Sequence, residues 1–291
     1  MAILAEPDLI VNNDGSVYHL CMKPQDLADT VIVVGDPQRV HEISDHFTNV
    51  EHTGSNREFN SCTGYFNGKR LTALSTGIGT GNCDIVMHEL DALANFDLKT
   101  RVQNPLLRSL NIIRVGTSGS IQPDVPVNSF CLSTHAVGLD NLLHFYSDSV
   151  KVIDHELTEA FAAHSTWPKD LSKPYFIAGT EELISLFKPF CVAGITVTSP
   201  GFYGPQGRYL RLSLTDPDMI KKLQSFRFKE QRIVNFEMET SALYGLGALM
   251  GHRMATVCVL IANRATGQYN QDHKRVVNDL IAMVLEQLTL R

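Results

Sequence analysis

The hydrophobic positions along the chain alternate between short, continuous apolar runs and longer stretches with helical spacing. Seven runs rich in β-branched residues predict strands covered on both faces, at residues 30–34, 71–75, 111–115, 130–134, 195–198, 233–236 and 256–261. Five stretches place apolar residues three and four positions apart and predict helices, at residues 83–96, 154–164, 216–226, 238–250 and 272–290. This alternation predicts one α/β domain with a mostly parallel or mixed sheet between helices.

Three segments lack this periodicity. Residues 1–16 have few periodic apolar positions and contain Asn-Asn-Asp-Gly, so we expect a flexible N-terminal extension followed by one domain over residues 17–291. Residues 97–109, which include an Asn-Pro pair, and residues 142–149 are less regular and predict loops or insertions.

The composition is typical of a globular protein and argues against a nucleic-acid partner. The chain has 291 residues, of which 44% are hydrophobic and 19% charged, enough for a large core. Its formal net charge is −6 and it has no block of Lys and Arg, whereas binding to a phosphate backbone needs a basic patch. We therefore expect small-molecule substrates.

The N-terminal residues and the cysteines indicate a cytoplasmic protein. Glu6 and Asp8 lie where a signal peptide would have positive charge followed by an apolar core. No run approaches the roughly 20 apolar residues of a membrane span, so we expect no membrane partner. The six cysteines are scattered singly, without the spacing of a zinc site, which predicts buried thiols in a reducing compartment and no bound metal.

Two glycine-rich segments that follow predicted strands carry an arginine. The first predicted strand leads into Gly35 and a helix whose first turn contains Arg39, and the free N–H groups at a helix start suit an oxyanion. The third predicted strand brings Arg114 and Thr117 to its expected end, where α/β folds build ligand sites. A further glycine-rich segment, residues 75–82, has neither dinucleotide-binding nor P-loop spacing. Together these junctions favour an anion site.

Two glutamates, Glu237 and Glu239, lie between a predicted strand and an apolar predicted helix. Carboxylates in the first turn of a helix commonly complement its dipole. Polar groups at the end of a strand also serve as ligands in α/β folds. The local sequence leaves both interpretations open.

The segments V-V-G-D-P-x-R-V, S-T-G-I-G, R-V-G-T-S-G and N-F-E-M-E-T, in this order and at these intervals, resemble the nucleoside phosphorylase family. The resemblance extends over residues 17–291. It implies a central mixed, partly barrel-like sheet flanked by helices, and an enzyme that splits a nucleoside with inorganic phosphate. It also implies no cofactor, because phosphate is a co-substrate.

For phosphate, the resemblance implies contacts from Gly35, Arg39, Arg114 and Thr117, and from Arg57 of a neighbouring subunit. Several guanidinium groups around a phosphate would supply bidentate hydrogen bonds and position it for attack. The arginines found in the glycine-rich segments therefore agree with the roles that the resemblance gives them.

For ribose, the resemblance implies that Glu239 accepts the 2′- and 3′-hydroxyls, that Met238 packs on the sugar, and that Glu237 contributes. His19 matches a histidine that crosses to the neighbouring site and contacts the 5′-hydroxyl. Active sites shared across a dimer interface imply a homo-oligomer, either a dimer or a hexamer of dimers. A structural monovalent cation between subunits is left open.

Residues 201–208 resemble the base-binding loop of the uridine phosphorylase type. The amide of Gln206 offers a donor and an acceptor, and Arg208 adds charged donors, so together they match the alternating edge of uracil. Phe202 supplies an aromatic wall. As the sugar becomes oxocarbenium-like, negative charge develops on uracil, and Arg208 is placed to stabilise it. We therefore expect the catalytic groups to be Arg114, Gln206, Arg208 and Glu239.

Purine-cleaving members of the family keep an aspartate after the last strand, where this chain has Asn263 followed by Arg264. An asparagine cannot protonate a purine. Uridine phosphorylases have Asn-Arg at this point, and we expect Arg264 to support the base pocket. We predict a uridine phosphorylase, which converts uridine and phosphate reversibly to uracil and ribose 1-phosphate. Departures such as Gly207 leave deoxyuridine and thymidine open as further substrates.

Three other functions remain as alternatives: a purine nucleoside phosphorylase, a nucleosidase that uses water, and a non-enzymatic nucleoside-binding protein. A nucleosidase would not need Arg39, Arg57 and Arg114 around a phosphate. A binding protein would be expected to have lost a phosphate ligand or the ribose glutamate. The sequence also lacks the G-x-S-x-G and H-E-x-x-H patterns of two large hydrolase classes.

Overall fold

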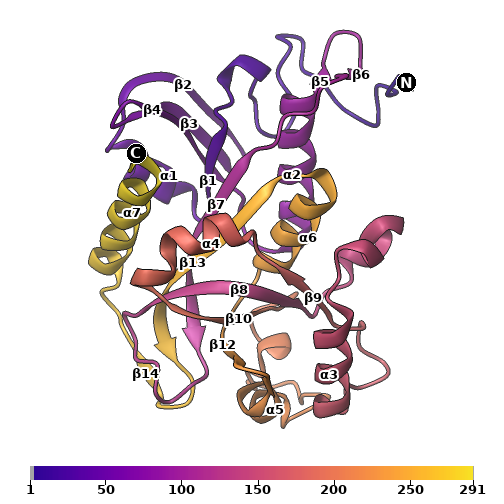
Figure 1. Cartoon of the computed structure of the whole chain (residues 1–291), viewed down its shortest axis with the longest axis vertical. Helices are drawn as coiled ribbons and strands as arrows, with labels where there is room; N and C mark the ends of the chain where they lie inside the picture. The colour runs from indigo at the N-terminus through magenta and orange to yellow at the C-terminus, as the bar shows by residue number, and fades with distance from the viewer. Residues whose placement is uncertain (1–2, 291) are drawn as a thin grey trace.

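The computed structural model describes residues 3–290, and Figure 1 shows a central sheet with helices on both of its sides. The strands in chain order are β1 (Thr30–Val34), β2 (Thr48–Asn56), β3 (Phe59–Phe66), β4 (Lys69–Ser75), β5 (Phe96–Asp97), β6 (Val102–Gln103), β7 (Asn111–Ser120), β8 (Phe130–Gly138), β9 (Tyr175–Ala178), β10 (Val192–Thr198), β11 (Arg227–Phe228), β12 (Gln231–Glu237), β13 (Arg253–Asn263) and β14 (Gln268–Tyr269).

The α-helices that the structure describes are α1 (Pro37–Ser44), α2 (Thr80–Asn95), α3 (His155–Ser165), α4 (Glu181–Phe187), α5 (Met219–Ser225), α6 (Thr240–Met250) and α7 (Lys274–Thr289). Short 3-10 helices are η1 (Pro24–Asp26), η2 (Leu142–Phe145), η3 (Ser147–Lys151), η4 (Lys188–Phe190) and η5 (Gly204–Gln206). Strands and helices alternate over much of the chain, as the hydrophobic pattern predicts.

Five strands of the main sheet close into a ring, in the order β7, β13, β8, β10 and β12. The ring closes because β12 pairs again with β7, through the partners Asn235 with Ser120 and Phe236 with Gly119. Four further strands, β1, β4, β3 and β2, extend the sheet from the open side of β7. Parallel pairs such as β1 with β7 and antiparallel pairs such as β8 with β13 both occur. The predicted mixed, partly barrel-like α/β fold is confirmed.

The long strand β7 corrects the expectation that Arg114 lies at the end of a strand. β7 continues to Ser120, so Arg114 lies within it. Gly116 faces the same side of the strand two residues on, where an added Cβ would lie 2.1 Å from Nη1 of Arg114. The glycine therefore serves to let the guanidinium group lie against the strand, rather than to form a turn.

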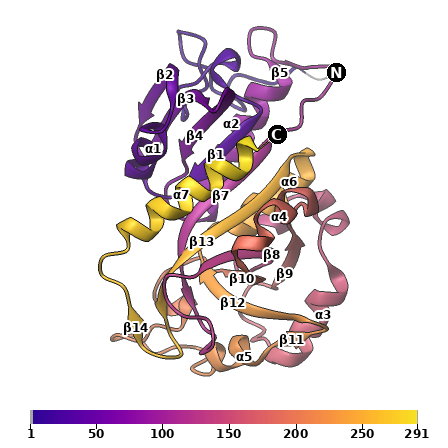
Figure 2. The same ribbon diagram turned by 60° about the vertical axis from the view of Figure 1, so that its left-hand side comes forward.

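Helices cover the two faces of the sheet in different groups, as Figure 2 shows. The side chains of β1 alternate between them, because Val31 and Val33 pack with α2 and α6 while Ile32 and Val34 pack with α1, α4 and α7. A third apolar cluster joins α3 and α5 to the ring strands. Both faces are thus buried, which explains the continuous apolar runs of the strands.

A chain of polar side chains crosses the ring from strand to strand. The hydroxyls of Ser133 and Thr196 lie 2.6 Å apart, and Thr196 donates to Oδ1 of Asn235 at 2.8 Å. Asn235 in turn donates from Nδ2 to Ser118 at 2.9 Å. Because each of these buried groups has a partner, the chain ties β8, β10, β12 and β7 together without leaving a polar group desolvated.

The hydrophobic pattern found the central strands and missed the peripheral ones. All seven predicted strands and all five predicted helices lie at strands or helices of the structure, with ends shifted by a few residues. The pattern did not predict β2, β3, β9 or α4. Residues 97–109 contain the small hairpin of β5 and β6, and residues 142–149 are largely 3-10 helix, so neither segment is a plain loop.

The N-terminal segment lies against the body of the domain from Leu9 onward. Leu9 is buried in the cluster that contains α2, and Val11 forms a bridge with Val17. Residues 1–2 of the predicted extension lie outside the described residues, and the flexibility of residues 1–16 stays a prediction. Within residues 3–290, no helix has the length and apolar character needed to cross a membrane.

Candidate active site

One pocket of about 960 Å³ collects most of the residues that the sequence singled out. Four helices begin at its wall, because Asp36 precedes α1, Ile78 lies just before α2, Glu239 precedes α6 and His273 precedes α7. Helix starts carry partial positive charge and free N–H groups, so the pocket favours anions. The predicted residues that line it are Gly35, Arg39, Arg114, Thr117, Phe202, Gln206, Arg208, Glu237, Met238 and Glu239.

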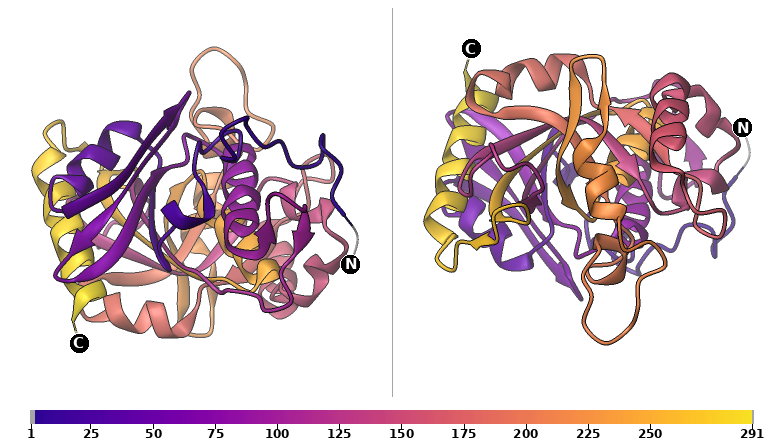
Figure 3. Two further views of the ribbon diagram at one scale, coloured as in Figure 1. Left: turned by 90° about the horizontal axis from the view of Figure 1, so that it is seen from above. Right: turned by 90° about the horizontal axis from the view of Figure 1, so that it is seen from below.

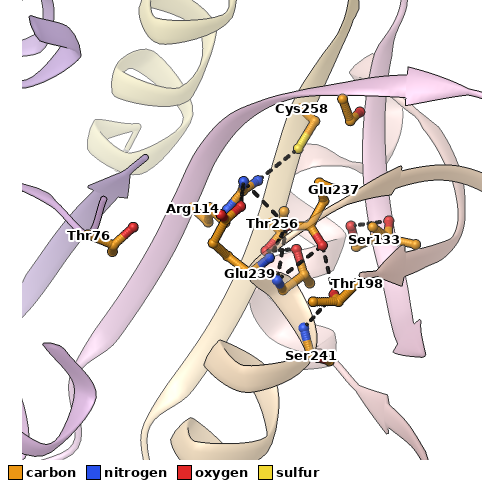
Figure 4. A network of polar contacts seen from close by, with 12 residues as sticks. Thr76, Arg114, Ser133, Thr198, Glu237, Glu239, Ser241, Thr256 and Cys258 are labelled. Atoms are coloured by element: carbon orange, nitrogen blue, oxygen red, sulfur yellow. Dashed lines mark hydrogen bonds and ion pairs between the residues drawn. The ribbon is translucent and has the colours of Figure 1, made fainter. Parts of the chain in front are cut away.

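Arg114 is the buried centre of the site, and Figure 4 shows it between two carboxylates and a thiol. Its Nη2 donates to Oε2 of Glu239 at 2.5 Å and lies 3.3 Å from Oε2 of Glu237. Its Nη1 donates to Sγ of Cys258 at 3.1 Å. Burial acts to lower the pKa of Arg114, but the carboxylates raise it well above the ordinary value. Arg114 is therefore a permanent cation at the floor of the pocket.

A second buried arginine, Arg39, lies on α1 beside the same pocket. It is 9% exposed, and its Nη1 lies 3.5 Å from the carbonyl oxygen of Val115. Burial lowers the pKa of Arg39, and the neighbouring charge of Arg114 adds to that effect. Among the described residues, Nε of Arg39 and Nε of Arg114 are buried without a hydrogen-bond partner. Two arginines that line one pocket indicate an anion site.

The second glycine-rich segment supports Glu239 rather than binding an anion by itself. Gly77 has φ of +70°, and a Cβ at this position would lie 2.5 Å from the side chain of Asn82. The turn brings the backbone N–H of Gly79 to Oε1 of Glu239 at 2.8 Å. Glu239 therefore accepts one hydrogen bond on each oxygen, from Gly79 and from Arg114.

The loop that follows β10 carries the other predicted group of residues. Arg208 donates to the carbonyl oxygen of Phe202 at 2.6 Å and to Oε1 of Gln206, and its guanidinium carbon lies 3.8 Å from the centre of the Phe202 ring. Gln206 is buried, whereas Phe202 is 51% exposed. Burial lowers the pKa of Arg208, and the nearby charge of Arg264 lowers it further. Phe202, Gln206 and Arg208 therefore contact one another at the pocket wall.

Arg264 does not line the pocket but holds this loop from outside. Its Nη1 donates to the carbonyl oxygen of Gln206 at 3.1 Å, and its Nη2 donates to that of Gly207 at 3.3 Å. The neighbouring Asn263 is buried and donates from Nδ2 to the carbonyl oxygens of Gln122 and Val125. From this strand end, Ile261 and Ala262 face the pocket instead.

His19 and Arg57 lie outside the lining of their own chain's pocket. His19 is held by Glu89, which lies 2.6 Å from Nδ1 and also accepts from the backbone N–H. Arg57 is exposed in the tight turn between β2 and β3, with φ of +53°. Asn56 donates from its side chain to the carbonyl oxygen of His19, so the two segments are joined.

Several pocket residues were missed by the sequence analysis, among them Glu58, Asn82, Tyr269 and His273. Tyr269 enters because β14 turns back on β13 and pairs Tyr269 with Ala262. A two-residue strand with exposed side chains leaves no hydrophobic pattern, so periodicity could not find it. Within residues 3–290, no group of three or more His, Cys, Asp or Glu side chains is placed to hold a metal ion. The expected lack of a cofactor stays a prediction.

The sheet is barrel-like, and its pocket contains two buried arginines, the carboxylate of Glu239 and an aromatic loop. These features are typical of an enzyme that binds an anion beside a polar ligand. The chain belongs to the phosphorylase superfamily, whose family model matches residues 29–289. This match covers the pocket walls from β1 to α7, and it confirms the family that the motifs indicate.

Three similar proteins illustrate the relationship. A uridine phosphorylase from Thermococcus kodakarensis is 30% identical over 260 residues, which cover 89% of this chain and 81% of that protein. A DeoD-type purine nucleoside phosphorylase from Hahella chejuensis is 26% identical over 271 residues, covering 92% of this chain and 96% of that protein. The structure of a Trypanosoma brucei nucleoside phosphorylase that shows uridine phosphorylase activity matches with a TM-score of 0.89 and 28% identity, covering 97% of this chain and 99% of that one.

Proposed function

We propose that this protein is a uridine phosphorylase, a pentosyltransferase that converts uridine and inorganic phosphate reversibly to uracil and ribose 1-phosphate. The observation that carries the proposal is that one pocket joins the Arg39 and Arg114 anion site, Glu239, and the Gln206–Arg208 pair. The relatives from T. kodakarensis and T. brucei, with their uridine phosphorylase name and activity, support the same reaction.

At one end of the pocket, phosphate would lie beside Gly35, Thr117 and the start of α1. Arg39 and Arg114 both line the pocket, so their guanidinium groups can bind it with charge-assisted hydrogen bonds. Holding phosphate and nucleoside together converts a two-body reaction into one within a complex, which favours attack on the sugar carbon. Met238, which also lines the pocket, would pack on the sugar.

At the other end, uracil would lie against Phe202 and the Gln206–Arg208 pair. Because Arg208 occupies the amide oxygen of Gln206, the amide NH₂ group is left to donate to a uracil oxygen. The charge of Arg208 favours the electron-rich uracil that leaves as the glycosidic bond breaks. The base end thus lowers the barrier by stabilising the leaving group.

Two features favour this reaction over its alternatives. The pocket wall formed by β13 consists of Ile261 and Ala262, which cannot protonate a purine as it leaves. The purine-cleaving relative from H. chejuensis also shares a lower identity with this chain than the relative from T. kodakarensis. Hydrolysis by water would need no phosphate beside Arg39 and Arg114.

We also propose that two subunits share their active sites. Arg57 is exposed and His19 is partly exposed, their segments are joined through Asn56, and both lie outside the pocket of their own chain, which suits contacts to a neighbouring ribose and phosphate. The assembly would be a dimer, or a hexamer made of such dimers. We further propose a cytoplasmic enzyme with small-molecule substrates, no nucleic-acid or membrane partner and no cofactor, with an intersubunit monovalent cation left open.

The proposed activity is tested by following ultraviolet absorbance during cleavage of uridine, with and without inorganic phosphate, and with inosine as a purine control. We expect loss of uridine that depends on phosphate, while inosine is unchanged. Cleavage without phosphate would identify a nucleosidase, and preferential cleavage of inosine a purine phosphorylase. If neither nucleoside is cleaved, the non-enzymatic nucleoside-binding protein becomes the favoured alternative.

The shared site is tested by mixing two inactive variants, Arg57→Ala and Glu239→Ala. If Arg57 serves the neighbour's pocket, hybrid dimers contain one site with both residues intact, and part of the activity returns. Exchange of subunits is followed independently by native mass spectrometry of differently labelled chains. Exchange without recovered activity would contradict the shared site.

A further inference from the structure

The guanidinium group of Arg114 is held on two sides, and the groups on those sides differ in charge. Its Nη2 donates to Oε2 of Glu239 at 2.5 Å and lies 3.3 Å from Oε2 of Glu237 (Figure 4). Its Nη1 donates to Sγ of Cys258 at 3.1 Å. Cys258 is fully buried and lies outside the residues that line the pocket, so it can affect a bound ligand only through a neighbour.

The register of β7 and β13 explains why Cys258 contacts this guanidinium group. The two strands are parallel, and Cys258 is the register partner of Gly116. Arg114 and Gly116 face the same side of β7, and a Cβ on Gly116 would lie 2.1 Å from Nη1 of Arg114. Nη1 therefore lies over Gly116 and reaches the side chain opposite it on the next strand. The space on β7 and the acceptor on β13 lie at the same level of the sheet.

The thiol of Cys258 is a neutral acceptor. Burial raises the pKa of this thiol above its ordinary value, although the charge of Arg114 acts to lower it. A thiol sulfur accepts hydrogen bonds weakly, but a charged donor strengthens the bond. Cys258 thus fixes the direction of Nη1 without cancelling its charge, whereas both partners of Nη2 are carboxylates.

Loss of this acceptor would leave the attraction of the two carboxylates unopposed. Glu237 and Glu239 already lie on the Nη2 side of Arg114. If the guanidinium group turned further toward them, Nη1 would also pair with a carboxylate. Phosphate would then meet a cation whose donors are occupied by other anions. The contact with Cys258 keeps an N–H group and the charge of Arg114 available to the pocket.

We propose that Cys258 is a positioning residue for phosphate binding. Its neutral thiol holds Nη1 of Arg114 against the attraction of Glu237 and Glu239, so that Arg114 presents its charge to the phosphate. This assignment rests on the proposed function, because it takes phosphate as the anion in the pocket. Arg114 contacts the phosphate, and Cys258 acts only through Arg114.

Two substitutions separate the role of the acceptor from that of packing. Cys258→Ala removes the acceptor, whereas Cys258→Ser replaces it with a hydroxyl that can also accept from Nη1. A hydroxyl costs more to bury than a methyl group, so the serine variant should be the less stable of the two in thermal unfolding. If Cys258 acts through Arg114, the serine variant nevertheless binds phosphate better. If Cys258 only fills space, phosphate affinity follows stability.

Phosphate affinity is measured by titration calorimetry with inorganic phosphate alone, and KM for phosphate is measured during uridine cleavage. We expect the dissociation constant to rise about tenfold in Cys258→Ala, the effect of one hydrogen bond to a charged group. In Cys258→Ser it should lie within about threefold of the wild type, because the hydroxyl restores an acceptor. KM for uridine should change less, since Nη2 keeps its contact with Glu239.

Cys131→Ala is the matched control. Cys131 is also fully buried, and it is the register partner of Cys258 on the neighbouring strand β8. Its thiol donates to Oδ1 of Asn235 at 3.4 Å. Both alanine variants lose the same buried atoms and should lose similar stability. Phosphate affinity within about twofold of the wild type is expected for Cys131→Ala, because its effect does not pass through Arg114.

Four results would overturn the positioning role. Cys258→Ala could bind phosphate as well as the wild type does, or Cys258→Ser could bind it no better than Cys258→Ala. A loss of phosphate affinity in Cys131→Ala as large as that in Cys258→Ala would attribute the effect to packing. An equal rise in KM for uridine and for phosphate in Cys258→Ala would indicate a general distortion of the pocket.

The calorimetric test does not depend on turnover of uridine. If the wild type cleaves no nucleoside, but phosphate affinity falls in Cys258→Ala and returns in Cys258→Ser, the proposed function has failed and the positioning role stands. If uridine phosphorolysis is confirmed and phosphate affinity is unchanged in Cys258→Ala, only the positioning role has failed. A wild type that binds no phosphate would overturn both.

Discussion

The two ends of the pocket are built in different ways. At the phosphate and ribose end, the polar groups lie on β7, on α1 and at the start of α6, where Arg114 and Glu239 are almost fully buried. At the base end they lie on a loop, and Figure 3 shows that the segment between η5 and α5 projects from the body of the molecule. The large side chains exposed there include Tyr209, Leu210 and Leu212.

The difference is one of support. Arg114 is held by its strand, by Glu239 and by Cys258, so packing and hydrogen bonds fix it from several sides. The base loop is held by two arginines. Arg208 donates to the carbonyl oxygen of Phe202 within the loop, and Arg264, at the end of β13, donates to the carbonyl oxygen of Gln206. A rigid end suits the part of the substrate that every nucleoside shares, while a loop lets the choice of base vary.

The largest effect should come from Gly116→Ala, which acts on the rigid end without removing a polar group. The new Cβ would lie 2.1 Å from Nη1 of Arg114 and 2.7 Å from its guanidinium carbon. Because Arg114 must then leave Glu239 and Cys258, we expect kcat/KM for both uridine and phosphate to fall about 10²- to 10³-fold, as for loss of one preorganised charged donor. Steady-state kinetics with each substrate varied in turn measures this loss.

Gly81→Ala is the matched control for this substitution. Gly81 lies in the first turn of α2 outside the pocket, and no atom lies within 4 Å of an added Cβ. Activity within twofold of the wild type is expected, with equal or higher thermal stability, since alanine favours a helix by about 1 kcal/mol over glycine. A Gly116→Ala variant that stays folded and retains more than a tenth of wild-type activity would show that Arg114 does not need the space beside Gly116.

Arg208→Ala should have the next largest effect, and it should be confined to the base end. The substitution removes the charge near the leaving uracil and also the contacts to Phe202 and Gln206. We expect kcat for uridine to fall about 10²-fold, as for loss of a charged group at the site where negative charge develops. KM for phosphate should change little, and circular dichroism melting should show an unchanged midpoint. A large rise in KM for phosphate would mean that the two ends are coupled.

Arg264→Ala should impair uridine binding less than Arg208→Ala impairs catalysis, because Arg264 holds the loop from outside the pocket. Loss of its hydrogen bonds to the carbonyls of Gln206 and Gly207 should raise KM for uridine about tenfold, with a smaller effect on kcat. Arg264→Lys keeps a single donor group and should recover part of the affinity. A kcat defect as large as that of Arg208→Ala would place Arg264 on the substrate instead.

The same division explains which features the sequence could predict. The central strands and the motif residues at the rigid end follow from continuous apolar runs and from spacing along one segment. The edge strand β2 carries mostly exposed polar residues and has no alternating pattern, so periodicity could not reveal it. The hydrogen-bonded chain from Ser133 to Asn235 also depends on closure of the ring, which no local pattern encodes.

At the site, local sequence indicated that Arg114 and Glu239 belong to one pocket, but it placed Arg114 at the end of a strand instead of within it. A glycine after a strand commonly marks a turn, whereas Gly116 lies within β7 and leaves room for a side chain. His273 could not be found, because a single histidine before a helix has no distinguishing spacing. Its position depends on how α7 lies across the sheet.

The smallest effect on activity should come from Asn263→Asp, which tests whether the base end could be converted to purines by one residue. The family resemblance points to this position, because it implies an aspartate here in purine-cleaving enzymes. In this structure, however, Nδ2 of Asn263 donates to the carbonyls of Gln122 and Val125 and the side chain is buried, so an aspartate would face two carbonyl oxygens and not the pocket. We expect a loss of about 2–4 kcal/mol in the free energy of unfolding, measured by urea denaturation, and no gain of inosine cleavage. Inosine phosphorolysis by the variant would show that this strand end reorients during the reaction, and the base end would then extend from the loop to β13.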